Sequence, residues 1–305
     1  MTKRKFSTRM LGRTVHEIVF DGVSAGWEAW GLLTSDRHTD NQYSDWEFQK
    51  EHLELAKKRG AFIIDAGDVF DLMQGKYDPR KDLDLLREEH KGQDYLDRVL
   101  RSAKRDYSPY AENFAVIGMG NHESNILDRL GTNMIDRLVV ELNRSLEDKK
   151  SDHHIYAGGY SGWVLFRFNI HKTVQRSKVL AYYHGSGGAS PVTRGVISTN
   201  RMSVYLPDAD IVLTGHTHDQ FVVPIPRVRI STQSGTLTQD NQYHVKTGTY
   251  KDERQDGFSG WALQQQDGAP KVKGACWVRF YLQDANNSII GMEFTPALAT
   301  SKVIE

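Results

Sequence analysis

Five short apolar segments of this chain each run directly into aspartate, asparagine or histidine residues. Short apolar segments are typical of buried strands, and open α/β sheets bind ligands at the carboxyl ends of their parallel strands. The pattern therefore predicts a sheet that gathers these polar side chains along one edge. In chain order, the polar groups are Asp36 and His38, Asp68 and Asp71, Asn121 and His122, His184, and the pair His216 and His218.

The first half of the chain alternates expected strands with expected helices. Segment 61–66 is apolar throughout, which predicts a strand buried on both faces. A helix is expected over 44–60, where Ser44 and Glu47 have the spacing of a capping box, and the strongest amphipathic helix is expected over 126–142. The alternation indicates an α/β fold. The other strands expected in this half are 15–20, 27–33 and 114–119.

The remaining segments are consistent with a single domain over residues 1–305, because no repeat or Pro/Ser linker divides the chain. The polar segment at about 72–111 has helical spacing and predicts a helical insertion. The part at about 219–305 is β-rich, and we interpret it as the second sheet and its edge. Strands are expected at 155–156, 163–168, 178–183, 211–213, 221–230, 242–250, 276–282 and 288–294, with a short helix at 198–205.

Composition narrows the functional classes. The 39 basic residues equal the 39 acidic residues, so no net charge draws the chain to nucleic acid or membranes, although a local basic patch stays open. Cys276 is the single cysteine, which excludes an internal disulfide framework and fits a reducing compartment. No apolar run could span a bilayer, and the first residues lack a signal-peptide core. These features predict a cytoplasmic protein with no membrane partner and leave its oligomeric state open.

The polar residues match the ligand set of a two-metal site for phosphoester hydrolysis. Two ions about 3.5–4 Å apart lower the pKa of a bridging water and hold the phosphate for in-line attack. A carboxylate must bridge the ions, while neutral imidazole and amide ligands limit the negative charge. We expect Asp36, His38 and His218 to hold one ion, Asn121, His184 and His216 to hold the other, and Asp68 to bridge them.

Four further residues have expected roles beside the metals. His122 is next to a ligand and is free to donate a proton to the leaving oxygen, and Asp71 is placed to orient it. The alternative for Asp71 is a surface or capping carboxylate. Arg80 and Arg194 are candidates for gripping the substrate phosphate, and the alternative for each is a solvated surface arginine.

Taken together, these motifs resemble the calcineurin-like metallophosphoesterase superfamily, over about two thirds of the chain. The resemblance implies a four-layer αββα sandwich with two mixed sheets flanked by helices. It also implies the ligand roles above, the acid role of His122, and two divalent ions, with manganese first and iron, zinc or nickel as alternatives. The matching motifs are Asp36-x-His38, Gly67-Asp68-x-x-Asp71, Gly120-Asn121-His122-Glu123, His184 and Gly215-His216-x-His218.

The chain departs from the family pattern at two places. Thr39-Asp40-Asn41 stands where a glycine is usual, and Leu72-Met73 replaces the Arg-Gly of protein phosphatases. We therefore predict a phosphodiesterase acting on nucleotides or nucleic-acid ends, with a phosphoester as its partner. A phosphomonoesterase or protein phosphatase is the alternative, because Glu123 is shared with that branch. A non-catalytic binding scaffold is the alternative from another class.

Overall fold

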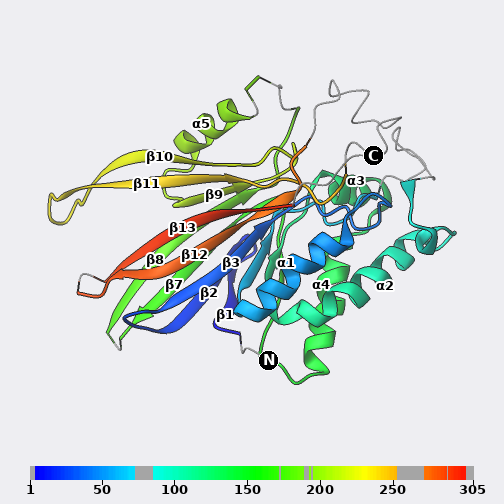
Figure 1. Cartoon of the computed structure of the whole chain (residues 1–305), viewed down its shortest axis with the longest axis horizontal. Helices are drawn as coiled ribbons and strands as arrows, with labels where there is room; N and C mark the ends of the chain where they lie inside the picture. The colour runs from blue at the N-terminus through cyan, green and yellow to red at the C-terminus, as the bar shows by residue number, and fades with distance from the viewer. Residues whose placement is uncertain are drawn as a thin grey trace.

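The computed structural model describes residues 4–72, 85–171, 173–188, 192–193, 195–252, 271–286 and 288–299. Its strands form two mixed sheets that pack face to face (Figure 1). The six-stranded sheet has the order β13 (Ile289–Leu298), β12 (Gly274–Asp284), β3 (Glu28–Thr34), β4 (Phe62–Asp65), β5 (Phe114–Ile117) and β6 (Tyr156–Ala157). The seven-stranded sheet has the order β1 (Ser7–Gly12), β2 (Val15–Val23), β7 (Ser161–Ile170), β8 (Val174–Tyr183), β9 (Ile211–Thr214), β11 (Leu237–Lys246) and β10 (Phe221–Ile230).

Helices cover the outer face of each sheet, as Figure 1 shows. The outer face of the six-stranded sheet shares one core with α1 (Trp46–Arg59), α2 (Tyr95–Tyr107), α3 (Asn121–Leu130) and α4 (Met134–Glu147). The outer face of the seven-stranded sheet is covered by α5 (Val196–Tyr205). The short 3₁₀ helices η2 (Glu88–His90) and η3 (Ser108–Asn113) flank α2. The predicted four-layer αββα sandwich is therefore confirmed.

The alternation of side chains along β3 and β4 explains why these strands are apolar throughout. Leu32 and Ile63 face the helices, whereas Leu33 and Ile64 face the other sheet. All four are fully buried. Because β3, β4 and β5 are parallel, their carboxyl ends lie at one edge of the sandwich. The parallel strands β8 and β9 end at the same place.

Two helix predictions need correction. The helix expected over 126–142 is two helices, because Gly131 takes a left-handed conformation (φ 66°) and ends α3. Asn133 then caps α4 by accepting hydrogen bonds from the amides of Ile135 and Asp136. The expected Ser44 cap is wrong as well, since Asp45 caps α1 and Ser44 donates instead to the carbonyl of Arg37 (2.7 Å).

The C-terminal strands do not form a sheet of their own. β10 and β11 extend the seven-stranded sheet, and β12 and β13 extend the six-stranded sheet. The strand expected at 242–250 lies earlier, at Leu237–Lys246, because it pairs along its whole length with β10. β1 was not predicted. Within the described residues, no helix is both long and apolar enough to cross a bilayer.

Candidate metal centre

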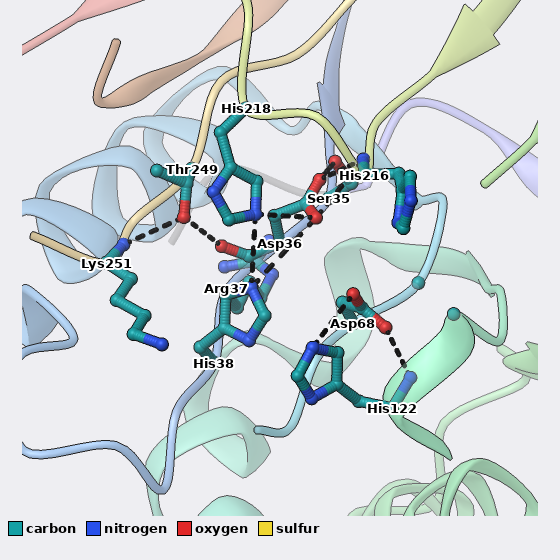
Figure 2. Close-up of polar contacts among 12 residues, drawn as sticks. Ser35, Asp36, Arg37, His38, Asp68, His122, His216, His218, Thr249 and Lys251 are labelled. Carbon is teal, nitrogen blue, oxygen red and sulfur yellow. Dashed lines mark hydrogen bonds and ion pairs between the residues drawn. The ribbon is translucent and has the colours of Figure 1, made fainter. Parts of the chain in front are cut away.

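The loops after five parallel strands bring the predicted ligands together (Figure 2). Asp36 and His38 follow β3, and Asp68 follows β4. The remaining ligands follow β5, β8 and β9, and they are Asn121, His184, His216 and His218. All of these side chains meet at the carboxyl edge that the two sheets share.

The first expected ligand set converges on one point. Nε2 of His218 lies 3.1 Å from Oδ1 of Asp36 and 3.3 Å from Nε2 of His38. Nε2 of His38 lies 4.0 Å from the same oxygen of Asp36. Figure 2 shows the three side chains directed at one another. One carboxylate and two imidazoles at these separations form a candidate metal-binding group.

The second expected set converges on a neighbouring point. Nε2 of His184 lies 3.1 Å from Oδ2 of Asp68 and 3.1 Å from Oδ1 of Asn121. Nδ1 of His216 lies 2.6 Å from the same oxygen of Asn121. Asp68, His184 and His216 offer donor atoms within 4.8 Å of one another, which makes a second candidate group.

Asp68 belongs to more than one of these groups. It joins His184 and His216 on one side and His38 and His122 on the other, with the donor atoms of each group within 4.8 Å of one another. The donors are imidazole nitrogens, carboxylate oxygens and one amide oxygen, a set that suits divalent transition metals. The residues present therefore fit a metal centre in which Asp68 is shared.

Neighbouring groups fix which nitrogen of two histidines faces the centre. Nδ1 of His184 lies 3.0 Å from the carbonyl oxygen of Ala66, so it carries the proton and donates. Nδ1 of His38 lies 3.0 Å from Oδ1 of Asp71. In both cases Nε2 is the nitrogen that faces the other predicted ligands. Carbonyl and carboxylate partners of this kind are common behind metal-bound histidines.

Three buried carboxylates keep their charge at the centre. Burial alone would raise the pKa of Asp36, but His218 outweighs it and lowers the value to about 2. Burial also opposes ionisation of Asp68, yet His184 and His122 hold its pKa well below the usual range. Lys251 and His38 do the same for Asp71. The result is a concentration of negative charge that attracts cations.

His122 occupies the first turn of α3, which begins at Asn121, earlier than the helix expected from residue 126. Its Nδ1 makes a short contact with the backbone carbonyl of Asp71, while its Nε2 lies 3.7 Å from Oδ2 of Asp68. The carboxylate of Asp71 is farther away, at 3.9 Å from Nδ1. Asp71 therefore orients His122 through its main chain, and its carboxylate turns to His38.

Three residues outside the predicted set hold the site together. Glu123 accepts hydrogen bonds from the amides of Asp68, Phe70 and Gly120 at 2.8–3.1 Å, which ties two ligand loops to each other. Burial raises the pKa of Glu123 to about 8, and the charge of Asp68 adds to this effect. The Gly120-Asn121-His122-Glu123 motif contained Glu123 but gave it no role.

Asp40 and Lys251 are the other two residues outside the predicted set that hold the site together. Asp40 accepts hydrogen bonds from the amides of Asp71 (2.5 Å) and Leu72 (3.0 Å). The segment Thr39-Asp40-Asn41, which departs from the family pattern, therefore anchors the loop after β4. Nζ of Lys251 lies 3.4 Å from Oδ1 of Asp71 (Figure 2 shows its side chain beside His38). No local pattern in the sequence could have placed Lys251 here, because it is 180 residues away from Asp71.

Several ligands have strained backbone conformations. Positive φ angles are uncommon outside glycine and cost about 1–3 kcal/mol each. Such strain persists only where the surrounding structure enforces it, and it concentrates at functional sites. The ligands concerned are Asp36 (52°), His38 (46°), Asp68 (54°), His216 (71°) and His218 (57°).

Two motif glycines allow the ligand loops to approach each other. A Cβ atom on Gly120 would lie 2.0 Å from Oδ1 of Asp68, and one on Gly215 would lie 2.4 Å from Oδ2 of Asp36. Neither position can therefore carry a side chain without moving a ligand.

Arg80 and Arg194, the predicted phosphate-gripping residues, lie outside the described residues.

No protein-family model matches the sequence, and a search of curated proteins found no significant match. A conserved protein of Streptococcus pneumoniae TIGR4, described as a predicted phosphoesterase, has a similar structure with 11% identity, 89% of this chain and 91% of that chain covered, and a TM-score of 0.34. GAP50 of Plasmodium, the anchor in the inner membrane complex, has 11% identity, coverages of 91% and 90%, and a TM-score of 0.39. Vps29 of Chaetomium thermophilum has 10% identity, coverages of 90% and 98%, and a TM-score of 0.33. Because these scores are low, we derive the metal centre from the side chains of this chain alone.

Proposed function

We propose that the protein is a metal-dependent phosphoester hydrolase that binds two divalent ions, with manganese as the preferred metal. The observation that supports this most strongly is the position of Asp68, whose carboxylate belongs to donor groups on both sides of it. One group is completed by His184 and His216, and the other contains His38 together with His122, which in this proposal donates a proton and is not a metal ligand. A shared carboxylate between two nitrogen-rich sets is the arrangement that a pair of ions requires.

The chemistry divides between the ions and the side chains. When bound, two divalent ions acidify water and neutralise the charge on the phosphoryl oxygens. In this proposal His122 holds a proton at Nε2 and transfers it to the leaving oxygen of the ester. Its Nδ1 is held by the carbonyl of Asp71, which keeps the ring directed at the centre.

We further propose that the substrate is a phosphodiester, such as a nucleotide or the end of a nucleic acid. The support is the sequence after Asp71, where Leu72 stands in place of the arginine of protein phosphatases. Leu72 is 1% exposed and its amide is held by Asp40, so this position offers no charge to a phosphate.

The proposal also includes a cytoplasmic location. The buried Cys276, which forms no disulfide, suits such a reducing compartment.

Metal analysis and two model substrates test the proposal. The purified protein should contain two equivalents of divalent metal and should hydrolyse bis(p-nitrophenyl) phosphate faster than p-nitrophenyl phosphate in the presence of Mn²⁺. Asp68→Asn should lose metal and activity together, because it removes the shared charge. A strong preference for the monoester would favour a phosphomonoesterase or protein phosphatase. Protein that binds no metal would favour a binding scaffold.

A further inference from the structure

A buried lysine lies beside the loop that carries His216 and His218 but takes no part in the metal centre. Lys246 is the last residue of β11. It pairs with Thr214 at the end of β9 and with Phe221 at the start of β10. Lys246 therefore sits between the two ends of the loop that joins these strands.

The ammonium group of Lys246 has no hydrogen bond or ion pair with an acid among the described residues, although the charges of Asp219 and Asp36 act on it from farther away. The residue is 7% exposed. Asp219 attracts Lys246 without forming an ion pair with it, and its Oδ1 lies 3.5 Å from Nζ of Lys271. Burial lowers the pKa of Lys246, as expected for a desolvated ammonium. Burying an unpaired charge is costly, so this position calls for an anion.

The N-terminus of α5 faces Lys246, and it also carries positive charge. A Cβ atom on Gly195 would lie only 3.0 Å from Nζ of Lys246, so the ammonium points at the residue that precedes α5. In the described part of the chain, Val196 donates to Thr193 and Thr199 donates to Gly195, and no acceptor meets the other amides of the first turn. The start of a helix carries a partial positive charge.

We propose that Lys246 and the N-terminus of α5 form a binding site for a phosphate group, separate from the metal centre. A phosphate accepts charge-assisted hydrogen bonds from an ammonium and from helix N-terminal amides at the same time. It would replace the repulsion between these two positive groups by attraction. Two sources share this chemistry: a second phosphate group of the substrate, which rests on the proposed function, and free phosphate.

Phosphate binding to the full chain tests the site directly. Isothermal titration calorimetry with inorganic phosphate is run on the protein as purified and again after its metals have been removed with a chelator. The metal-free protein should bind phosphate, and Lys246→Met should weaken this binding at least about tenfold, because it removes a charge-assisted hydrogen bond. Lys246→Arg should retain it.

Two further variants keep the test decisive. Lys104→Met, which removes an equal charge from α2, should leave phosphate binding unchanged. Ser198→Asp places a carboxylate on an exposed position of the first turn of α5 and should weaken phosphate binding by repulsion. Because Ser198→Asp leaves Lys246 in place, it tests the phosphate site even if Lys246→Met does not fold. Metal-free protein that binds no phosphate in the millimolar range, or equal binding by wild type and Ser198→Asp, would overturn the proposal.

The source of the phosphate is found with two substrates of the metal-loaded protein. A dinucleotide with a 5′-phosphate should have a lower KM than the same dinucleotide without it, and Lys246→Met should abolish the difference. Equal KM values in the wild type would assign the site to free phosphate. Failure of the metal-free titration counts against the phosphate site, whereas a protein that hydrolyses neither dinucleotide counts against the proposed function.

Discussion

Arg37→Met should strongly destabilise the protein, because it breaks a completely buried ion pair. Arg37 lies between the ligands Asp36 and His38, and its side chain is inaccessible to solvent. Its Nε donates to Oδ2 of Asp65 at 2.5 Å, and Asp65 is equally buried. Burial lowers the pKa of Arg37, but Asp65 outweighs this effect and raises it. Arg37 therefore keeps its charge in the folded protein.

The size of the effect follows from what the substitution leaves behind. Methionine fills part of the space between the rings of Tyr107, Phe114 and Tyr250, which lie 5.3–5.7 Å from the guanidinium carbon. It leaves the carboxylate of Asp65 buried without its partner, which typically costs about 3–5 kcal/mol. For a chain of this size, that loss corresponds to a Tm lower by on the order of 10 °C.

Thermal unfolding of metal-free protein, followed by circular dichroism, measures this effect without a contribution from metal affinity. The double variant Arg37→Met, Asp65→Asn should recover much of the lost Tm, because it removes the unpaired charge. Arg279→Met is the matched control. Arg279 forms exposed ion pairs with Glu28 and Glu293, so its loss should change Tm far less.

The effect should also depend on pH. Burial raises the pKa of Asp65, and the contact with Arg37 only partly offsets this, so the pKa rises further in the variant. A carboxyl group with a raised pKa stabilises the folded state fully below its unfolded pKa, and this stabilisation is lost as the pH rises through the folded pKa. The Tm deficit of Arg37→Met should therefore shrink as the pH falls through the raised pKa of Asp65. A deficit that is small, or that grows toward low pH, would refute the reasoning.

The remaining predictions concern the metal centre. His122→Ala should keep its metals and slow turnover most on esters with poor leaving groups, and equal slowing on good leaving groups would count against an acid role. Gly120→Ala should reduce the metal content, since its Cβ would lie 2.0 Å from a carboxylate oxygen of Asp68. Lys251→Met should lower kcat/KM about tenfold with metal content retained, because Asp71 loses the ammonium at 3.4 Å, and Lys251→Arg should restore part of the rate.

Gly188→Ala is the control for the glycine prediction. A Cβ atom on Gly188 would meet no other atom within 4 Å, and the backbone there is not left-handed. The same chemical change should therefore leave the metal content as it is in the wild type. A loss of metal in both variants would mean that added methyl groups act through general destabilisation and not through Asp68.

The sequence by itself indicated an α/β fold with buried strands and the membership of the candidate metal centre, and the resemblance carried by its motifs added the four layers. The apolar segment 61–66 indicated a strand buried on both faces, and β4 has this character because one face meets helices and the other meets a sheet. Ligands such as Asp68 and His184 were identifiable because each directly follows an apolar strand. Strand burial and strand ends are local properties, and a few neighbouring residues are enough to encode them.

Signals at helix ends were present in the sequence but were outweighed by periodicity. The apolar spacing over 126–142 continues through Gly131, so it predicted one helix, although a glycine followed closely by Asn133 is typical of a helix end and a new start. The Ser44 cap failed for a different reason. The hydroxyl of Ser44 is needed by Arg37, which belongs to another element.

Only the tertiary structure decided how remote segments pair. It divided the C-terminal strands between the two sheets, turned the carboxylate of Asp71 from His122 to His38, and placed Lys251 against it. It also set Lys246 against the start of α5. Such contacts join residues far apart in the chain, and their geometry depends on how whole surfaces pack against each other. That information is spread over the entire sequence and is not contained in any single stretch of it.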